Sequence, residues 1–228
     1  MRRSDDITID EARDLVADQM LWPLVRNFLW DFAPQMHESW IDSSVARYLT
    51  TELSPRLKRF ILETLGVSPC FHTFPKDDWS RLLLLDGATL ESIAKWLGAL
   101  ACADSLRRVT SGKTVRELKA VLPGVYPEVF GYTMYFKRHA VESSDRQAVE
   151  SSEQVVRCGV ECLSSFVSEL PEPLRHRFML KLPKSFFSVD DPTVRRSDDP
   201  TIRRFDGLTI NLRLLLKLRF PEAYSLCC

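Results

Sequence analysis

The sequence predicts a mostly α-helical protein, and three observations lead to this fold class. Glycine is scarce, at 8 of 228 residues, while hydrophobic residues make up an ordinary 45%. The long segments are filled by Leu, Arg, Glu and Ala, which are strong helix formers. Apolar residues recur three and four positions apart, as on one face of a helix. We therefore expect a single compact helical domain with a helical extension before it.

The first two helices are expected at the N-terminus. Thr8 and Glu11 form a capping box, which predicts a helix that begins near Ile9. Pro23 suits the first turn of a helix and is followed by an apolar, Trp-rich stretch. A second helix with a broad buried face is therefore expected to begin near Pro23.

Two further helices are expected at residues 42–53 and 54–65. In the second, Ser54 is the predicted N-cap, Pro55 takes the first helical position and Gly66 follows the end.

After an irregular connector, an apolar face predicts a strong helix at residues 89–109, and Gly112 is expected to break it. Thr114 and Glu117 form a second capping box, so a short helix is expected to follow and to end at residues 123–124.

A long helix is expected before Pro171, because five apolar residues share one stripe at 4-3-4-3 spacing: Val156, Val160, Leu163, Val167 and Leu170. Pro171 and Pro173 end this helix, and another is expected at residues 174–182.

The C-terminal region is ambiguous. Residues 208–220 alternate between apolar and mostly polar side chains, which is typical of a strand, yet they are rich in helix formers. We favour helix, and the alternative is a short β-pairing of residues 178–182 with 208–220. The direct repeat at residues 190–205 is expected to form a solvated loop, and Cys227 with Cys228 an ordinary free tail.

The charge balance argues against electrostatically driven partners. The chain has 31 Lys and Arg against 31 Asp and Glu, so no net field attracts nucleic acid or an anionic membrane. The N-terminus lacks a secretory signal, and the longest aliphatic block, at residues 82–85, is far shorter than the roughly 20 residues that span a bilayer. We expect a cytosolic protein whose partners are proteins.

No constellation of residues predicts catalysis, a cofactor or a metal. Cys158 and Cys162 would share a helix face, but no second local pair completes four zinc ligands, so packing is the better interpretation. The motifs of nucleophile elbows, phosphate loops and dinucleotide sites are not in the sequence. The four histidines are far apart and form no metal motif: His37, His72, His139 and His176.

Tryptophan and arginine supply the candidate partner-binding residues. Large aromatic residues dominate cores, and we expect Trp30 and Trp96 to be buried. Tryptophan is also enriched at interface hot spots. The candidate anchors are Trp22, in the Trp-rich N-terminal region, and Trp40, which has polar neighbours.

A second candidate surface is formed by Arg107 and Arg108. Both lie at the C-terminal end of their expected helix, where positive charge also complements the helix dipole.

Three segments carry a resemblance to a known family. They are LGALACADSLRRV leading into TVRELKAVL, then GVECLSSFVSELPEPLRHRFMLKLP, and the leucine-rich C-terminal segment. Together they resemble the K subunit of the bacterial type III secretion sorting platform, the SctK or YscK family. The resemblance extends from about Leu21 to the end of the chain, which implies an SctK-like helical adaptor domain at residues 21–228 and an N-terminal extension at residues 1–20.

The resemblance implies a cytosolic adaptor without catalytic residues, required for effector secretion. Members link the cytosolic domain of the inner-membrane ring protein, SctD, to the pod protein, SctQ, and so indirectly to the SctL stator and the SctN ATPase. The implied location is the bacterial cytoplasm, at the cytosolic face of the secretion apparatus, with no direct membrane insertion. Two alternatives are a helical enzyme with an unrecognised active site and a chaperone-like or regulatory helical binding protein.

Overall fold

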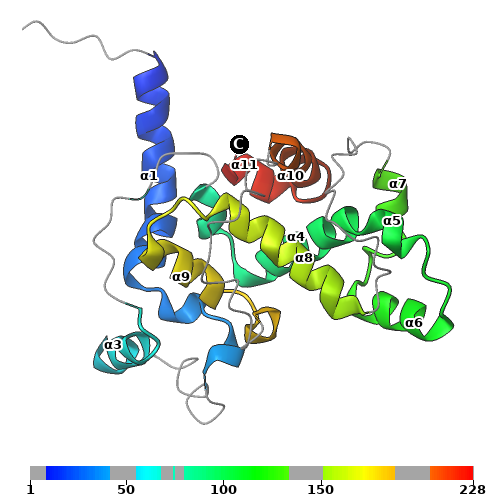
Figure 1. Ribbon diagram of the computed structural model, residues 1–228. Helices are drawn as coiled ribbons and strands as arrows, with labels where there is room; N and C mark the ends of the chain where they lie inside the picture. The colour runs from blue at the N-terminus through cyan, green and yellow to red at the C-terminus, as the bar shows by residue number, and fades with distance from the viewer. Residues whose placement is uncertain are drawn as a thin grey trace, which may run out of the picture.

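A computed structural model describes residues 9–41, 55–67, 74, 80–133, 151–187 and 206–227. These residues form ten α-helices and four short 3-10 helices without a strand, which confirms the predicted fold class. The α-helices are α1 (Ile9–Trp30), α3 (Pro55–Thr64), α4 (Gly87–Ala101), α5 (Ala103–Leu106), α6 (Gly112–Val121), α7 (Val129–Tyr132), α8 (Ser152–Phe166), α9 (Glu172–Leu180), α10 (Asp206–Arg219) and α11 (Pro221–Cys227) (Figure 1). The 3-10 helices are η1 (Ala33–Gln35), η2 (Glu38–Trp40), η3 (Ser80–Leu84) and η4 (Lys184–Phe186).

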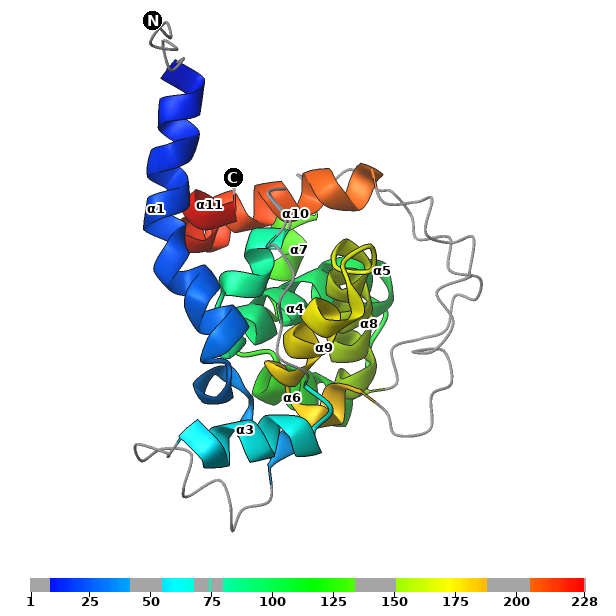
Figure 2. The same cartoon turned by 90° about the vertical axis from the view of Figure 1, so that its left-hand side faces the viewer.

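The centre of the molecule is the pair α4 and α8, which pack directly against each other (Figure 1, Figure 2). A Cβ at Gly98 of α4 would overlap the carbonyl oxygen of Val155, and a Cβ at Gly159 of α8 would overlap that of Ala94. The two helix backbones are therefore in contact, and glycine is required at both positions because no side chain fits between them.

The apolar stripe predicted for α8 is confirmed. Four of its five members are buried: Val156, Val160, Leu163 and Val167. The fifth, Leu170, is half-buried and lies beyond the end of the helix. The stripe faces the core because the 3.6-residue period of a helix keeps these positions on one side.

α1 is one continuous helix, whereas two were predicted. Pro23 lies inside it, although proline removes one backbone hydrogen bond from a helix interior. The ring of Pro23 is exposed, and the C-terminal half of α1 is held to the core by buried Val25, Phe28 and Leu29. The N-terminal part of α1 projects beyond the other helices (Figure 1, Figure 2). The expected boundary between residues 20 and 21 falls inside this helix.

The single helix predicted at residues 89–109 is two helices. α4 ends at Ala101, and Cys102, with φ −92° and ψ 6°, separates it from α5. Gly112, predicted to end a helix, is the first residue of α6, because Ser111 supplies the cap that accepts the Thr114 backbone N–H at 3.5 Å.

α3 begins at Pro55 as predicted, and Gly66 follows its end with φ 70°, in the left-handed region that favours glycine. Several other predictions lie outside the described residues: the helix at 42–53, the repeat at 190–205, His72, His139 and Cys228.

The C-terminal segment is helical, so the β-pairing alternative is wrong. Residues 208–219 belong to α10, and residues 178–180 belong to α9. Leu212, Leu215 and Leu216 are buried at helical spacing. The free-tail prediction is also wrong for Cys227, which is fully buried at the end of α11.

A buried lysine, Lys181, connects three elements of the core. Lys181 follows α9, and its Nζ donates to the carbonyls of Leu83 at 2.6 Å and Leu85 at 2.8 Å. The ammonium lies 5.0 Å from the centroid of the Phe28 ring of α1. The same group thus connects α9, the η3 segment and α1.

Candidate partner-binding surfaces

The outer side of α1 presents two tryptophans. Trp22 is 51% exposed and Trp30 is 55% exposed, and their rings meet edge to face with centroids 5.5 Å apart. Because α1 continues through Pro23, the eight-residue spacing returns Trp30 to the side of Trp22. The prediction that Trp30 is buried is therefore wrong, whereas Trp96 is buried, at 6% exposed.

This Trp22–Trp30 pair has the properties of a protein-binding surface. Arg26, one helical turn from each tryptophan, is exposed between them. Tryptophan and arginine, with tyrosine, are enriched at interface hot spots. Trp30 was not expected beside Trp22, because a helix that begins at Pro23 would not continue the spacing between the two tryptophans.

Trp40, the last residue of η2, packs against η4 and the residues beside it. We call this contact between residues 37–40 and residues 180–187 the clasp. The indole N–H of Trp40 donates to the Leu182 carbonyl at 2.8 Å, and its ring packs against Phe187 with centroids 6.0 Å apart. Lys184 Nζ lies 5.8 Å from the centroid of the same ring. Trp40 is consequently half-buried.

Two further hydrogen bonds close this clasp, one to a side chain and one between backbone groups. The Lys184 N–H donates to Ser39 Oγ at 2.8 Å, and the His37 N–H donates to the Leu180 carbonyl at 2.8 Å. The segment after α1 is thereby attached to the segment after α9. Trp40 thus has a structural role, and its role as a partner anchor stays a prediction.

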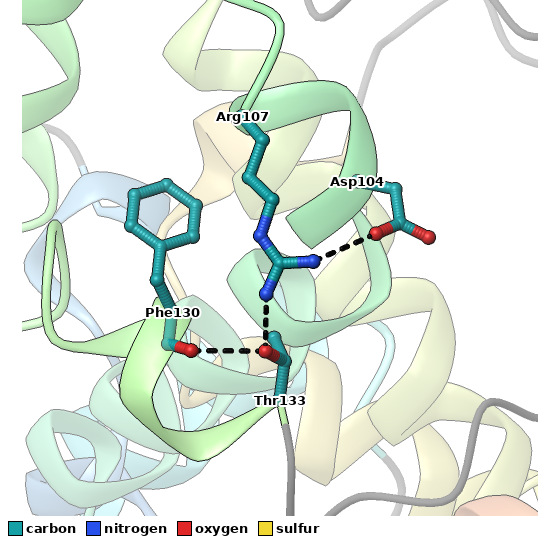
Figure 3. A network of polar contacts seen from close by, with 4 residues as sticks. All are labelled: Asp104, Arg107, Phe130 and Thr133. Carbon is teal, nitrogen blue, oxygen red and sulfur yellow. Dashed lines mark hydrogen bonds and ion pairs between the residues drawn. The ribbon is translucent and has the colours of Figure 1, made fainter.

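Arg107 connects α5 to α7 (Figure 3). Its guanidinium pairs with Asp104 at 3.1 Å and donates to Thr133 Oγ1, which itself donates to the Phe130 carbonyl at 2.9 Å. The guanidinium carbon also lies 5.8 Å from the centroid of the Phe130 ring. Arg107 therefore positions α7 while part of its side chain faces solvent.

Arg108 is exposed, and its guanidinium forms no ion pair with another described residue. Its backbone N–H donates to the Ser105 carbonyl at 3.0 Å, at the end of α5. Of the two arginines, Arg108 is thus the one that is exposed without an ion pair to another described residue.

The two exposed surfaces are far apart. α1 and α5 lie on opposite sides of the molecule, with α4 and α8 between them (Figure 1). The structure does not bring Trp22 together with Arg107 and Arg108, so they form two separate surfaces.

The described residues show no arrangement suited to metal chemistry. Among them, no three His, Cys, Asp or Glu side chains are placed to hold a metal ion. Of the histidines, His37 shares a hydrogen bond of 2.8 Å with Ser39. His176 lies beside Gly66, and burial lowers its pKa. None of the described helices combines the length and apolar character needed to cross a bilayer.

Comparison with known proteins places the chain in a family. The family model for YOP proteins translocation protein K (YscK) matches residues 27–204. The chain belongs to the YscK family. The match confirms the resemblance found in the sequence and makes this chain a type III secretion protein. The curated proteins and the solved structures gave no match.

The YscK match covers most of the helical body. It includes Trp30, Trp40, Arg107 and Arg108, whereas Trp22 precedes it. α10 and α11 follow the matched residues and complete the core of this YscK-family protein.

Proposed function

We propose that this YscK-family protein is a non-enzymatic cytosolic adaptor of the type III secretion sorting platform. It links the cytosolic domain of the SctD-like ring protein to the SctQ-like pod protein, and through the pod to the SctL-like stator and the SctN-like ATPase. The observation that carries the proposal is the family match over residues 27–204. The bacterial cytoplasm, at the cytosolic face of the apparatus, is the corresponding location.

The separation of the two exposed surfaces supports a linking role. An adaptor must bind two partners at once, so its binding surfaces must not overlap. The Trp22–Trp30 pair and Arg108 lie on elements on different sides of the α4–α8 centre (Figure 1). We propose that each surface binds a different partner.

The test is capture of the two partners by purified variants of the full chain. The Trp22→Ala/Trp30→Ala variant should lose affinity for one partner, and Arg108→Glu should lose affinity for the other. Interface anchors contribute about 2 kcal/mol when truncated, which corresponds to a loss of affinity of about 30-fold. Effector secretion should fall with each variant.

Phe60→Ala is a matched control, because Phe60 is an exposed aromatic residue on α3, outside both surfaces. Trp40→Ala is a third variant, because Trp40 was also predicted as a partner anchor. Melting curves separate a loss of binding from unfolding, which matters most for this variant because Trp40 is part of the clasp. If the folded variants bind both partners with native affinity, these surfaces are not the binding sites. If the native protein binds neither partner, the adaptor assignment fails.

A further inference from the structure

The end of the molecule that carries Arg108 has an excess of positive charge. Between residues 103 and 121 only Asp104 and Glu117 are acidic, whereas five side chains are basic and exposed: Arg107, Arg108, Lys113, Arg116 and Lys119. The chain as a whole has equal numbers of acidic and basic residues, so the excess belongs to this end.

The two acids neutralise only part of this charge. Asp104 pairs with Arg107 at 3.1 Å, and Glu117 lies 3.9 Å from Lys113. Both pairs are exposed, so water and salt weaken them. The other three basic side chains form no ion pair with another described residue. Their charge is therefore available to a partner.

α6 presents its basic residues on one outer face. Lys113, Arg116 and Lys119 recur every three residues, which places them within about a third of the circumference of the helix. Leu118, on the other side, is fully buried, and α6 packs against α8. Ala120, which lies among the three basic residues, is small and exposed, so no bulky side chain separates them.

Arg108 lies near the start of this face. It precedes Gly112, the first residue of α6, by four residues, and an extended chain of that length spans at most about 14 Å. α5 and α6 lie at the same end of the molecule, away from α1 (Figure 1). We name the set Arg108, Lys113, Arg116 and Lys119 the basic face.

We propose that the basic face binds an acidic protein segment, rich in Asp and Glu, in the partner that occupies the Arg108 surface. The inference rests on the proposed adaptor function and adds the chemistry of one partner to it. Arginine matches a carboxylate with two parallel hydrogen bonds, and lysine attracts it as a point charge. Complementary charges of this kind speed association and select the correct partner.

Two other anionic surfaces fit the basic face less well. A membrane-bound helix inserts its apolar side into the bilayer, but the apolar Leu118 and Leu122 are fully buried in the protein core. Proteins that bind single-stranded nucleic acid stack bases on exposed aromatic rings. Tyr126 and Phe130, the described aromatic residues that follow α6, are half-buried and contact each other edge to face. Protein carboxylates are thus the favoured anions.

The first experiment is carbodiimide cross-linking of the native full-length chain to each captured partner, because this reagent joins a carboxylate to a lysine amine that it contacts. Peptide mapping should find Lys113 or Lys119 joined to Asp or Glu residues of one partner. Lys217, an exposed lysine on α10, is the internal reference and should be joined about tenfold less often.

The second experiment is charge reversal. Arg116→Glu/Lys119→Glu should weaken capture of that partner by about tenfold or more at 0.1 M salt. The native chain and the variant should converge at about 1 M salt, because the Debye length falls from about 10 Å to about 3 Å. Arg56→Glu/Lys217→Glu, on α3 and α10, is the matched control, since it makes the same change in net charge at exposed positions outside the basic face.

Equal losses in the two variants, or cross-links only through Lys217, would overturn the proposal. The cross-links are read on the native chain, so they decide the question even if a variant fails to fold. Arg116→Glu/Lys119→Glu that loses binding to phosphatidylglycerol vesicles or duplex DNA, but captures both partners normally, would also overturn it, because the face would then serve another anion.

This test can fail independently of the adaptor assignment. Native capture of both partners that charge reversal leaves unchanged refutes the acidic segment and leaves the adaptor function standing. If the native chain captures neither partner, the adaptor function fails, and a labelled poly-glutamate peptide then tests the basic face directly. The native chain should bind this peptide and Arg116→Glu/Lys119→Glu should not, whereas no binding by the native chain would end the proposal.

Discussion

At the scale of single residues, Lys181 is an ionisable group buried among backbone carbonyls. Burial lowers its pKa from the ordinary 10.5 to about 7, although the Asp86 carboxylate acts in the opposite direction. A neutral amine still has two N–H donors, which is the number that the carbonyls of Leu83 and Leu85 accept.

This pKa predicts a pH dependence of stability. Between about pH 7 and 10.5 the unfolded chain binds a proton at Lys181 that the folded chain lacks, so the free energy of unfolding should rise with pH in that window. Urea unfolding across the window measures the slope. Lys181→Met should remove this contribution, whereas a slope unchanged by the substitution would contradict the assignment to Lys181.

Lys181→Met should also destabilise the protein at every pH. It leaves two buried carbonyls without a donor, and each costs about 1 to 3 kcal/mol, so a loss of about 2 to 6 kcal/mol is expected. Lys119→Met, at an exposed position near the end of α6, is the control and should change the free energy of unfolding by less than about 0.5 kcal/mol.

Leu163 tests the buried stripe of α8. It is fully buried, so Leu163→Ala should lower the free energy of unfolding by about 2 to 5 kcal/mol through lost transfer energy and a cavity. Leu218→Ala on the exposed side of α10 serves as the comparison. A loss below about 1 kcal/mol at Leu163 would mean that this side of α8 is not part of the core.

At the scale of elements, the contact of α4 with α8 depends on two glycines. Gly98→Ala and Gly159→Ala should each destabilise by about 2 kcal/mol or more, because the added Cβ overlaps a carbonyl of the facing helix. Helix propensity alone predicts the opposite sign, since Ala is better than Gly by about 1 kcal/mol. Chemical denaturation distinguishes the two effects.

Gly131→Ala is the matched control for this prediction, because Gly131 lies in α7 with open space around its Cα. It should be neutral or stabilising by up to about 1 kcal/mol. Equal effects at Gly98 and Gly131 would show that the helix contact does not require glycine.

The ends of a helix were predictable where residues of that helix itself determine them. Pro55 and Gly66 bracket α3 as expected, since a proline at the first turn and a left-handed glycine after the last act through the backbone of their own helix. The separation of α4 from α5 and the continuity of α1 through Pro23 were not predicted, because packing against other elements decides them.

At the scale of the whole molecule, Arg219 attaches the C-terminal helices to the core. Its guanidinium lies 4.6 Å from the centroid of the Trp96 ring and 4.8 Å from that of Tyr132, and it pairs with Glu128. α10 is thereby fixed to α4 and α7, although it follows the residues that match the family.

Arg219→Ala should lower the free energy of unfolding by about 1 to 3 kcal/mol, through the loss of two cation–π contacts and the ion pair. The exposed Lys217 on the same helix offers the comparison, and Lys217→Ala should change stability by less than about 0.5 kcal/mol. Similar values for the two variants would show that Arg219 does not hold α10 in place.

The sequence by itself determined the helical class, the buried stripe of α8 and the membership of the family. These properties depend on residues that are close together in the chain. Val156, Val160 and Leu163, for example, share one face because of their spacing along a single helix.

The tertiary structure alone decided the exposure of Trp30, the clasp around Trp40 and the burial of Lys181 among backbone carbonyls. Each of these depends on contacts between segments far apart in the chain. Trp40 and Leu182 are 142 residues apart, for example, and no local pattern records that pairing. The physical reason is that burial and hydrogen bonding are settled by neighbours in space, which periodicity along the chain does not identify.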